Sequence, residues 1–352
     1  MKEEAFFVSS NTPMSDERNP VYYCSHQELR EQRMPAVNVI IPNLDGESLL
    51  PISLGSLRNQ TFKQFDVTVV DNGSKDGSLD LLREQYPEAK VIRLDRNYGF
   101  ASAVNRGVEA SKGEFISLLN NDMELDSKWL EELHRALVDH PEVGGCGSKV
   151  LRYRERERIN VLGIRLNRNG EVEIIGAGKV DQGQYEEMQY VFGVSAGASL
   201  YRKKMFEEIG LFDETFFASY EDVDLSFRAQ LAGYKALYVP RAVAYHMVGE
   251  TIKRRRYFPT YLNNRNKILF FWKNMPDEIL KKYFSKIFWS KTSLFLKRIF
   301  LNFYKVRTYY FLKGTVAAYF RFPYLLKERK RIKGTRKVSL DYLESIMDKD
   351  FI

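Results

Sequence analysis

The chain has 352 residues and a mass of 41.2 kDa, which is enough for one large domain and an additional segment. Hydrophobic residues make up 44% of it and charged residues 28%, values that exclude a disordered or collagen-like protein. The formal net charge of +8 is unevenly distributed along the chain. Residues 253–337 hold 24 Lys and Arg against three acids, a charge of +21, so the rest of the chain carries −13.

Residues 1–34 are polar and contain turn signals such as Arg-Asn-Pro, and we interpret them as an N-terminal extension. They do not show the basic segment followed by an apolar segment that a secretory signal needs. Two cysteines are too few for a disulfide framework, so we predict a cytoplasmic protein. The sequence has no window of 18 apolar residues, so a membrane-spanning helix is not expected.

From residue 35 onward, short β-branched runs alternate with helical patterns. Strands are expected at residues 37–42, 65–71, 90–94 and 114–120, and helices near residues 47–59, 77–85, 100–111 and 127–140. This alternation predicts βαβ units and a parallel sheet. After residue 141 short strand patterns follow, with a hairpin signal at Asn167–Gly170 and a later helix at residues 222–232. We assign residues 35–252 to one α/β domain.

Polar residues follow each strand of the predicted parallel sheet. Ligands bind at the carboxyl ends of such strands, so these residues are expected to line one edge. They are Asn43, Asp71, Asn72, Arg96, Asn97, Asn120, Asn121 and Asp122, with Pro42 directly before Asn43. The oxygen-bearing side chains around Asp122 suit Mg²⁺ or Mn²⁺ bound together with a phosphate. The alternative is that they only cap the next helix.

Three acids, Glu221, Asp222 and Asp224, open the later helix. The helix dipole alone is enough to account for acids at this position. Aromatic residues directly before them would shield a carboxylate from water, and a shielded carboxylate can act as a general base. His246 ends an apolar strand, where a half-buried structural histidine is the ordinary expectation.

Four motifs follow one another in the sequence: VNVIIPN, VVDNGSKDGS, RNYGFASAVNRGVEASKGEFISLLNND, and the segment Ser195–His246 that contains SYEDVDLSFRAQ. With them, residues 37–246 resemble the family-2 glycosyltransferases of the GT-A fold, in the branch of bacterial rhamnosyltransferases and galactofuranosyltransferases. The implied fold class is α/β. It consists of a GT-A, Rossmann-like nucleotide-diphospho-sugar transferase domain with a mostly parallel central sheet, followed by a C-terminal helical region that is basic and aromatic.

The resemblance implies an inverting transfer of a sugar from a nucleoside-diphosphate donor to a hydroxyl group. The acceptor would be a glycan or a polyprenyl-linked glycan in cell-surface polysaccharide synthesis. We favour dTDP-rhamnose as the donor, and UDP-linked sugars such as galactofuranose or glucose are the alternative. The donor nucleotide would contact Pro42, Asn43, Asp71, Asn72, Arg96, Asn97, Asn105, Asn120 and Asn121.

The resemblance also implies a divalent cation, Mg²⁺ or Mn²⁺, on the pyrophosphate. Asp122 would bind it, and His246 stands where the family has a further ligand. Asn120 occupies the place of the first acid in the family's Asp-x-Asp motif, so this chain has one carboxylate fewer for the metal.

Asp222 matches the catalytic base of the family. Glu221 and Gly197 are expected near the acceptor or the sugar, and the alternative for Gly197 is a bulge in a buried strand. Asp224 and Arg228 are expected to brace the helix that carries the base.

Residues 253–352 form the predicted C-terminal region, which either associates with a membrane or pairs with a second copy. Residues 286–313 read as an amphipathic helix whose Lys and Arg lie mostly on one half. The catalytic domain, a second copy or a membrane could cover its apolar face. Lipid-linked acceptors and the basic charge favour an anionic membrane, so we predict a peripheral protein on the inner face of the cell membrane.

Two other classes of function are weighed against the enzyme. A nucleic-acid-binding protein would interleave basic and aromatic residues, whereas here they lie on different helical faces, so nucleic acid is not an expected partner. A non-catalytic GT-A scaffold would have no need of Asp71, Asp122, Asp222 and His246 together.

Overall fold

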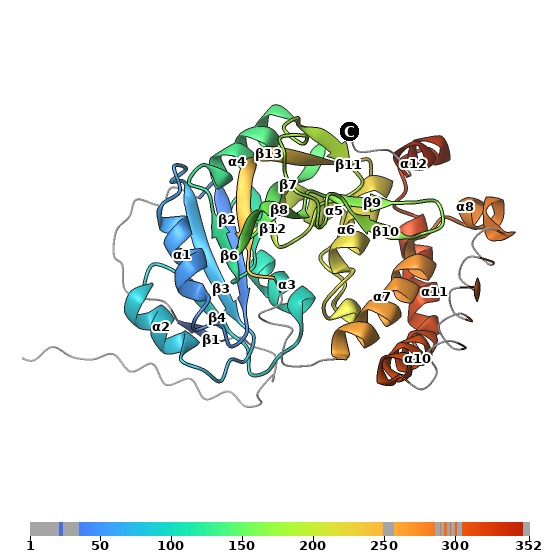
Figure 1. Cartoon of the computed structure of the whole chain (residues 1–352), viewed down its shortest axis with the longest axis horizontal. Coiled ribbons are helices and arrows are strands. Elements are labelled where there is room, and N and C mark those ends of the chain that lie inside the picture. Colours follow the sequence, from blue (N-terminus) through green and yellow to red (C-terminus); the bar gives the residue numbers. More distant parts are fainter. Residues whose placement is uncertain are drawn as a thin grey trace, which may run out of the picture.

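The computed structural model describes residues 21–23, 35–248, 257–285 and 305–347, and the positions 289, 292, 293, 296 and 300. Its strands are β1 (Val21–Tyr23), β2 (Val37–Asn43), β3 (Phe65–Asp71), β4 (Lys90–Arg93), β5 (Phe115–Leu119), β6 (Met123–Leu125), β7 (Val143–Arg152), β8 (Glu155–Val161), β9 (Ile164–Leu166), β10 (Val172–Ile174), β11 (Gln189–Val191), β12 (Ala198–Arg202) and β13 (Lys235–His246). Eleven of these strands form one sheet in the order β1-β4-β3-β2-β5-β12-β7-β13-β11, with β6 on β13 and β8 on β7 (Figure 1).

The half of the sheet formed by β4, β3, β2 and β5 is parallel, as predicted from the alternation of strands and helices. β2 is buried on both faces: Val37, Val39 and Ile41 belong to one hydrophobic core, and Ile40 belongs to the core on the other face. A strand of this kind needs a nearly continuous apolar run, which explains the sequence VNVIIPN. Beyond β5 the sheet is mixed, because β12 runs antiparallel to both β5 and β7.

The helices are α1 (Leu50–Arg58), α2 (Ser78–Gln85), α3 (Phe100–Ala110), α4 (Trp129–Asp139), α5 (Lys203–Ile209), α6 (Glu221–Leu231), α7 (Phe258–Asn274), α8 (Asp277–Lys282), α10 (Val306–Tyr319), α11 (Phe322–Lys333) and α12 (Leu340–Ile346), with a short 3₁₀ turn at Glu214–Phe216. Buried side chains of α1, α2 and α4 pack on one face of the sheet, and those of α3, α5 and α6 pack on the other. The expected hairpin is present, since β9 and β10 pair antiparallel around Gly170 at φ +71°.

The C-terminal helices lie beside α6, on the side of the molecule away from β2–β4 (Figure 1). A third hydrophobic core joins Phe227 of α6 to Phe270 of α7, Leu325 of α11 and Leu343 of α12. The helix α10 crosses α7 closely, because a Cβ added to Gly314 would lie only 2.6 Å from the carbonyl oxygen of Tyr261. The preceding domain therefore covers the buried faces of α7 and α11. The three covers considered for the apolar face of residues 286–313 remain open. The boundary after residue 252 stays a prediction.

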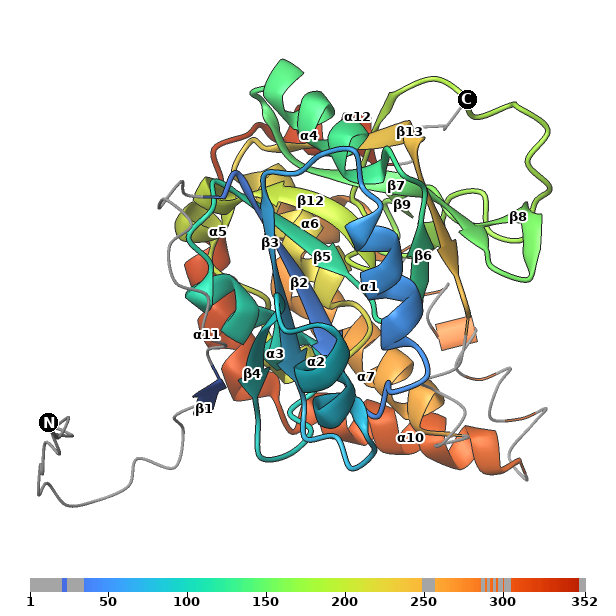
Figure 2. The same ribbon diagram turned by 90° about the vertical axis from the view of Figure 1, so that its left-hand side faces the viewer.

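Two other sequence expectations concern the ends of the chain. Within the extension 1–34, residues 21–23 pair antiparallel with β4 and add an edge strand, which Figure 2 shows beside the parallel strands. The predicted amphipathic helix at 286–313 lies largely outside the described residues, and α10 begins at Val306. Among the helices that the structure describes, none has both the length and the apolar character needed to cross a membrane.

Candidate active site

The carboxyl ends of β2, β3 and β5 are tied together by buried side chains. Asn43 Nδ2 donates to Asp71 Oδ1 at 3.3 Å and to Ser74 Oγ at 3.2 Å. Asn43 Oδ1 accepts a hydrogen bond of 2.8 Å from Asn121 Nδ2. The sequence prediction that these polar residues meet at one edge of the sheet is therefore confirmed for Asn43, Asp71 and Asn121. Pro42 precedes Asn43 in the same strand.

A second set of bonds joins Asn72 to the loop after β4. Asn72 Oδ1 accepts from the Tyr98 backbone N–H at 2.9 Å, and Asn72 Nδ2 donates to Asn97 Oδ1 at 3.2 Å. The Arg96 and Asn97 side chains are exposed, and the Arg96 guanidinium lies 4.8 Å from the centre of the Tyr98 ring. Glycine is required at Gly73, since its φ is +79° and a Cβ there would lie 2.6 Å from Arg96 Cα. The loops that carry Asn72 and Arg96 thus form one polar rim.

Asn105 lies apart from this rim, on α3. Its Nδ2 donates to the carbonyl oxygen of Phe212 at 2.9 Å and to Glu214 Oε1 at 3.1 Å, and its Oδ1 accepts from the Phe212 N–H at 3.0 Å. Both polar atoms of the buried amide are thus used to hold the segment after α5. The structure does not bring Asn105 into contact with the other predicted nucleotide residues.

Asp122 and His246 are brought together from different parts of the sheet. Asp122 Oδ2 lies 3.3 Å from His246 Nε2, and His246 Nδ1 lies 2.9 Å from Asn160 Oδ1. If Nδ1 carries the proton that bonds Asn160 Oδ1, a neutral His246 presents its Nε2 lone pair to the carboxylate. Two lone pairs at this distance need a proton or a cation between them. This is the usual arrangement around a metal-binding histidine, whose second nitrogen is fixed by an outer-shell acceptor.

Asp122 Oδ1 is buried and has no hydrogen-bond partner within the part of the chain that the structure describes. Such an atom is costly to leave unpaired, so it fits a cation ligand. Among the same described residues no third His, Cys, Asp or Glu joins the pair. Asp122 and His246 therefore fit a divalent cation whose remaining ligands come from elsewhere, as the loss of the acid at Asn120 also requires.

Asp222 lies in the first turn of α6, and its Oδ1 accepts from the Val223 N–H at 2.8 Å. Burial raises the pKa of the Asp222 carboxyl to about 6, although backbone donors, including that of Ala196, lower it. Burial and the neighbouring Asp222 charge raise the pKa of Glu221 to about 8. Glu221 Oε2 is buried without a partner among the described residues. Both carboxyls are therefore easier to protonate than solvated ones, and Glu221 more so than Asp222.

The segment before β12 connects the base candidate to the strand ends. Ala196 hydrogen-bonds to Asp222 through its backbone, and Gly197 O accepts from the Asn120 N–H at 2.8 Å. A Cβ on Gly197 would lie 3.0 Å from Asn120 Nδ2 and 3.2 Å from Met123 Cε, so a side chain there would crowd the edge. Two consecutive residues thus link the Asp222 carboxyl to the segment that carries Asp122.

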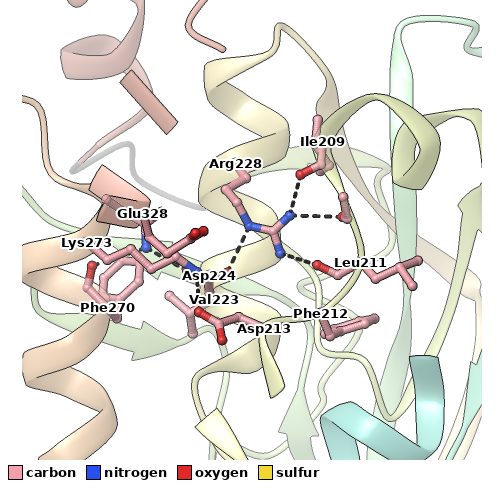
Figure 3. Close-up of polar contacts among 12 residues, drawn as sticks. Ile209, Leu211, Phe212, Asp213, Val223, Asp224, Arg228, Phe270, Lys273 and Glu328 are labelled. Atoms are coloured by element: carbon pink, nitrogen blue, oxygen red, sulfur yellow. Dashed lines mark hydrogen bonds and ion pairs between the residues drawn. The ribbon is translucent and has the colours of Figure 1, made fainter. Parts of the chain in front are cut away.

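Asp224 and Arg228 form a buried ion pair, as expected for residues that brace α6 (Figure 3). Arg228 donates to the carbonyl oxygens of Ile209, Gly210 and Leu211 at 2.8–3.0 Å. Burial works to raise the pKa of Asp224, but the charges of Lys273 and Arg228 lower it to about 2.

Sequence reasoning missed the contribution of α7 to this network. Lys273 Nζ lies 2.6 Å from Asp213 Oδ2 and 2.8 Å from Asp224 Oδ1, and Asn274 Nδ2 donates to Asp224 Oδ1 at 2.8 Å. A signal was available in the sequence: Asn266, Lys273 and Asn274 lie at helical spacing on one face of an aromatic-rich helix. Polar residues on the buried face of a helix usually have buried polar partners.

The α/β sheet with an edge of polar strand ends fits the GT-A fold of nucleotide-sugar transferases. Residues 38–210 match the family model of glycosyl transferase family 2, so this part of the chain is a domain of that family. The N-acetylglucosaminyl-diphospho-decaprenol L-rhamnosyltransferase of Mycobacterium tuberculosis is 28% identical over 218 residues, 55% of this chain and 70% of the relative. The O-antigen biosynthesis protein RfbC of Myxococcus xanthus is 29% identical over 213 residues, 58% of this chain but only 16% of RfbC.

A solved structure supports the same fold. The crystal structure of GalNAc-T7 with UDP, GalNAc and Mn²⁺ is similar to this chain with a TM-score of 0.57 and 15% sequence identity. The similarity covers 71% of this chain and 49% of GalNAc-T7. The predicted α/β GT-A fold, with C-terminal helices after the sheet domain, is thereby confirmed.

Proposed function

We propose that the protein is an inverting glycosyltransferase that moves a sugar from a nucleoside-diphosphate donor to a hydroxyl of a glycan or lipid-linked glycan in cell-surface polysaccharide synthesis. One observation carries this proposal. A shielded carboxylate, Asp222, is joined through Ala196 and Gly197 to the strand-end edge that holds Asp122. This hydrogen-bonded link supports a base for the acceptor beside a site for the donor diphosphate.

In the proposed reaction the acceptor hydroxyl oxygen forms a bond to the anomeric carbon, and its proton passes to the Asp222 carboxylate. The bond from that carbon to the donor phosphate breaks, and the electron pair leaves with the nucleoside diphosphate. Attack opposite the leaving group inverts the anomeric centre. A well-placed general base contributes about 10²–10⁴-fold to such a step, and a carboxyl with a pKa near 6 is ionised at neutral pH while still basic.

Asp122 and His246 are the residues that we assign to a divalent cation, Mn²⁺ or Mg²⁺. Two observations support this assignment. Asp122 Oδ1 has no hydrogen-bond partner among the described residues, and Asn160 fixes the orientation of the His246 ring. The GalNAc-T7 structure contains Mn²⁺ together with UDP. When bound, the cation would offset the negative charge that the leaving diphosphate gains.

We assign the donor nucleotide to the polar rim of the strand ends. Asn43 is held by its bonds to Asp71 and Asn121, and Asn72 by its bonds to Asn97 and Tyr98. The exposed Arg96 and Asn97 can meet the ligand directly. Further members of the assigned set are Pro42, Asn120 and Asn121. The rhamnosyltransferase relative supports rhamnose as the sugar, for which we favour dTDP-rhamnose as the donor. The UDP bound to GalNAc-T7 supports the UDP-sugar alternative.

We propose that the surface of α10 and α11 lies near the acceptor. Large apolar side chains are exposed there: Val306, Tyr309, Val316, Tyr319, Phe320, Phe322 and Leu326. Residues 305–327 contain five Lys and Arg and no acid. An exposed face that is both apolar and basic fits an anionic lipid surface, where polyprenyl-linked acceptors would be found. A second copy of the chain is the alternative cover.

The experiment that tests the function is a donor panel. Release of nucleoside diphosphate is measured for dTDP-rhamnose, UDP-galactofuranose, UDP-glucose and UDP-N-acetylglucosamine, with Mn²⁺, with Mg²⁺ and with a chelator. We expect turnover of one donor, strongest for dTDP-rhamnose, that a chelator abolishes and Asp222→Asn lowers by about 10²–10⁴-fold. Undiminished turnover in the Asp222→Asn protein would contradict the assigned base.

A further inference from the structure

The segment that precedes the acids of α6 has a strained backbone. Phe217, Ser219 and Tyr220 have positive φ angles of 66°, 71° and 71°. The left-handed region disfavours residues that carry a Cβ, so three such residues close together persist only where the surroundings hold them in place. Asp222 follows two residues later, so the path of this segment determines where its carboxyl lies.

One buried side chain of α7 supplies much of that support. Asn266 Nδ2 lies 2.8, 2.9 and 2.7 Å from the carbonyl oxygens of Phe216, Ala218 and Ser219. The Asn266 side chain is fully buried, so no water competes for these bonds. Its two amide hydrogens are shared among three carbonyl groups of the strained segment.

The neighbouring residue of α7 completes the contact. Arg265 Nη2 donates to the carbonyl oxygens of Thr215 and Phe216, both at 2.9 Å. Arg265 Nε donates to Asn266 Oδ1 at 2.9 Å, which fixes the direction of the amide and leaves its Nδ2 facing the carbonyl groups. Arg265 and Asn266 thus act as one unit with five bonds to the strained segment.

The strained segment also borders the donor side of the site. Phe217 O accepts from the Ala101 N–H at the start of α3, and a Cβ on Gly99 would lie 2.5 Å from the same oxygen. Gly99 O in turn accepts from Asn72 Nδ2 at 3.0 Å. A shift of the segment would therefore move Asp222 relative to the rim that we assign to the nucleotide.

We propose that Asn266 and Arg265 are positioning residues for Asp222, so that α7 is part of the catalytic apparatus although it lies beyond residue 210, where the family match ends. Their role is to fix the strained segment so that the Asp222 carboxylate meets the acceptor hydroxyl in line with the donor. This inference rests on the proposed role of Asp222 as the base.

The helix offers a matched pair of substitutions. Asn266→Asp preserves the size of the side chain but sets a carboxylate oxygen against three carbonyl oxygens. Asn264→Asp makes the same chemical change two residues earlier, where Nδ2 instead donates to Phe311 O and Thr315 Oγ1 of α10, both at 2.7 Å. Asn264→Asp therefore disturbs the packing of α7 on α10 without touching the strained segment.

The test uses the full chain with the donor that the wild type turns over in the panel. We expect Asn266→Asp to lower kcat by about 10²-fold, the loss typical of a catalytic group displaced by about 1 Å, with the donor KM and calorimetric dTDP or UDP binding unchanged. The acid limb of its kcat profile should also shift to lower pH, because water reaches the loosened Asp222 and lowers the pKa of its carboxyl. Asn264→Asp should retain kcat and the wild-type pH profile.

Equal losses of kcat in the two variants, or a parallel loss of nucleotide binding in Asn266→Asp, would overturn the proposal and leave a structural role only. If Asn266→Asp does not fold, Arg265→Lys provides the second test, since it keeps the charge and removes the fork to two carbonyls. Faster hydrogen exchange over residues 215–222 in that variant, with unchanged kcat, would also count against it. An active Asp222→Asn protein would refute the base itself, whereas an inactive Asp222→Asn beside a normal Asn266→Asp would refute only this inference.

Discussion

The ring of His246 lies between Asp122 and Asn160, with one ring nitrogen facing each side chain. The distance is 3.3 Å from His246 Nε2 to Asp122 Oδ2, and 2.9 Å from His246 Nδ1 to Asn160 Oδ1. His246 ends β13, Asp122 lies in the turn after β5, and Asn160 lies in β8. Asn160 itself has no feature in the sequence that marks it, and its importance follows only from this arrangement.

Asn160→Ala should weaken metal binding. The substitution removes the acceptor that sets the His246 tautomer, and losses of about 10–100-fold in metal affinity are typical when such an outer-shell partner is removed. The Mn²⁺ affinity can be measured by titrating donor turnover with Mn²⁺. It can also be measured from the electron paramagnetic resonance signal of Mn²⁺ in the presence of nucleoside diphosphate. Asn59→Ala, at the exposed end of α1, is the control and should leave the Mn²⁺ curve unchanged.

The rate of transfer should rise with pH through about 6. Burial raises the pKa of Asp222 to about 6, and the base works only when ionised, so kcat falls about tenfold per pH unit below that value. A kcat profile from pH 4.5 to 8.5 with saturating donor and acceptor is the measurement. A profile that stays flat down to pH 5 would assign the proton transfer to another group.

Glu221→Gln should stabilise the protein at high pH. The folded-state pKa of Glu221 is raised to about 8, above the value of a solvated carboxyl, so ionisation costs folding stability as the pH rises from about 4.5 toward 8. A neutral amide escapes this cost. Thermal unfolding should therefore show a higher Tm than wild type at pH 8.5 and a similar Tm at pH 5. Glu84→Gln on the exposed side of α2 should show no such divergence.

Lys273→Met should destabilise the fold strongly. Lys273 is 1% exposed and faces both Asp213 and Asp224. Its loss removes the ion-pair partner of Asp213 and leaves the buried Asp224 with Arg228 alone. We expect a loss of about 3–5 kcal/mol in the free energy of unfolding, measured by urea denaturation. Lys267→Met on the same helix removes a more exposed pair with Glu171 and should cost less than about 1 kcal/mol. Comparable losses for the two would show that the buried network contributes little.

The exposed face of α10 should bind anionic membranes. Val316 and Phe320 are 54% and 83% exposed, and Val316→Asp with Phe320→Asp places charges where apolar contact with lipid is expected. Flotation with phosphatidylglycerol vesicles at low salt should recover the wild type and lose the double variant. Val138→Asp on α4, at a site 55% exposed, is the matched control and should float. A double variant that floats as well as wild type, or a wild type that floats with neither anionic nor neutral vesicles, would contradict membrane docking.

The sequence predicted the structure best where a short local pattern determines it, as in buried strands and tight turns. Buried runs such as Val37–Asn43 predicted the parallel strands, and because parallel strands end at one edge, the meeting of Asn43, Asp71 and Asn121 followed from topology alone. The Asn167–Gly170 turn predicted its hairpin in the same way. Such features depend on short-range periodicity and on rules of chain connection.

Contacts between elements far apart in the chain could not be predicted in this way. Asn105 matches the family motif, yet its amide is satisfied by Phe212 and Glu214, more than 100 residues later. The clamp of Asn266 on residues 216–219 likewise depends on how α7 packs, which no local pattern specifies. The high positive charge of residues 253–337 gave no information about this packing, because the charged side chains lie mainly on the surface of these helices and the packing depends on their buried faces.

The helix α6 contributes to two hydrophobic cores, with Leu225 and Ala229 in the core beneath the sheet and Phe227 and Leu231 in the core shared with the C-terminal helices. This has a practical consequence for any attempt to exchange parts between relatives. A chain ended near residue 252 would open one whole side of α6 to water, and the base it carries would lose its support. Hybrid enzymes built to alter donor choice should therefore exchange the strand-end loops of β2–β5 and retain α6 together with α7 from a single parent.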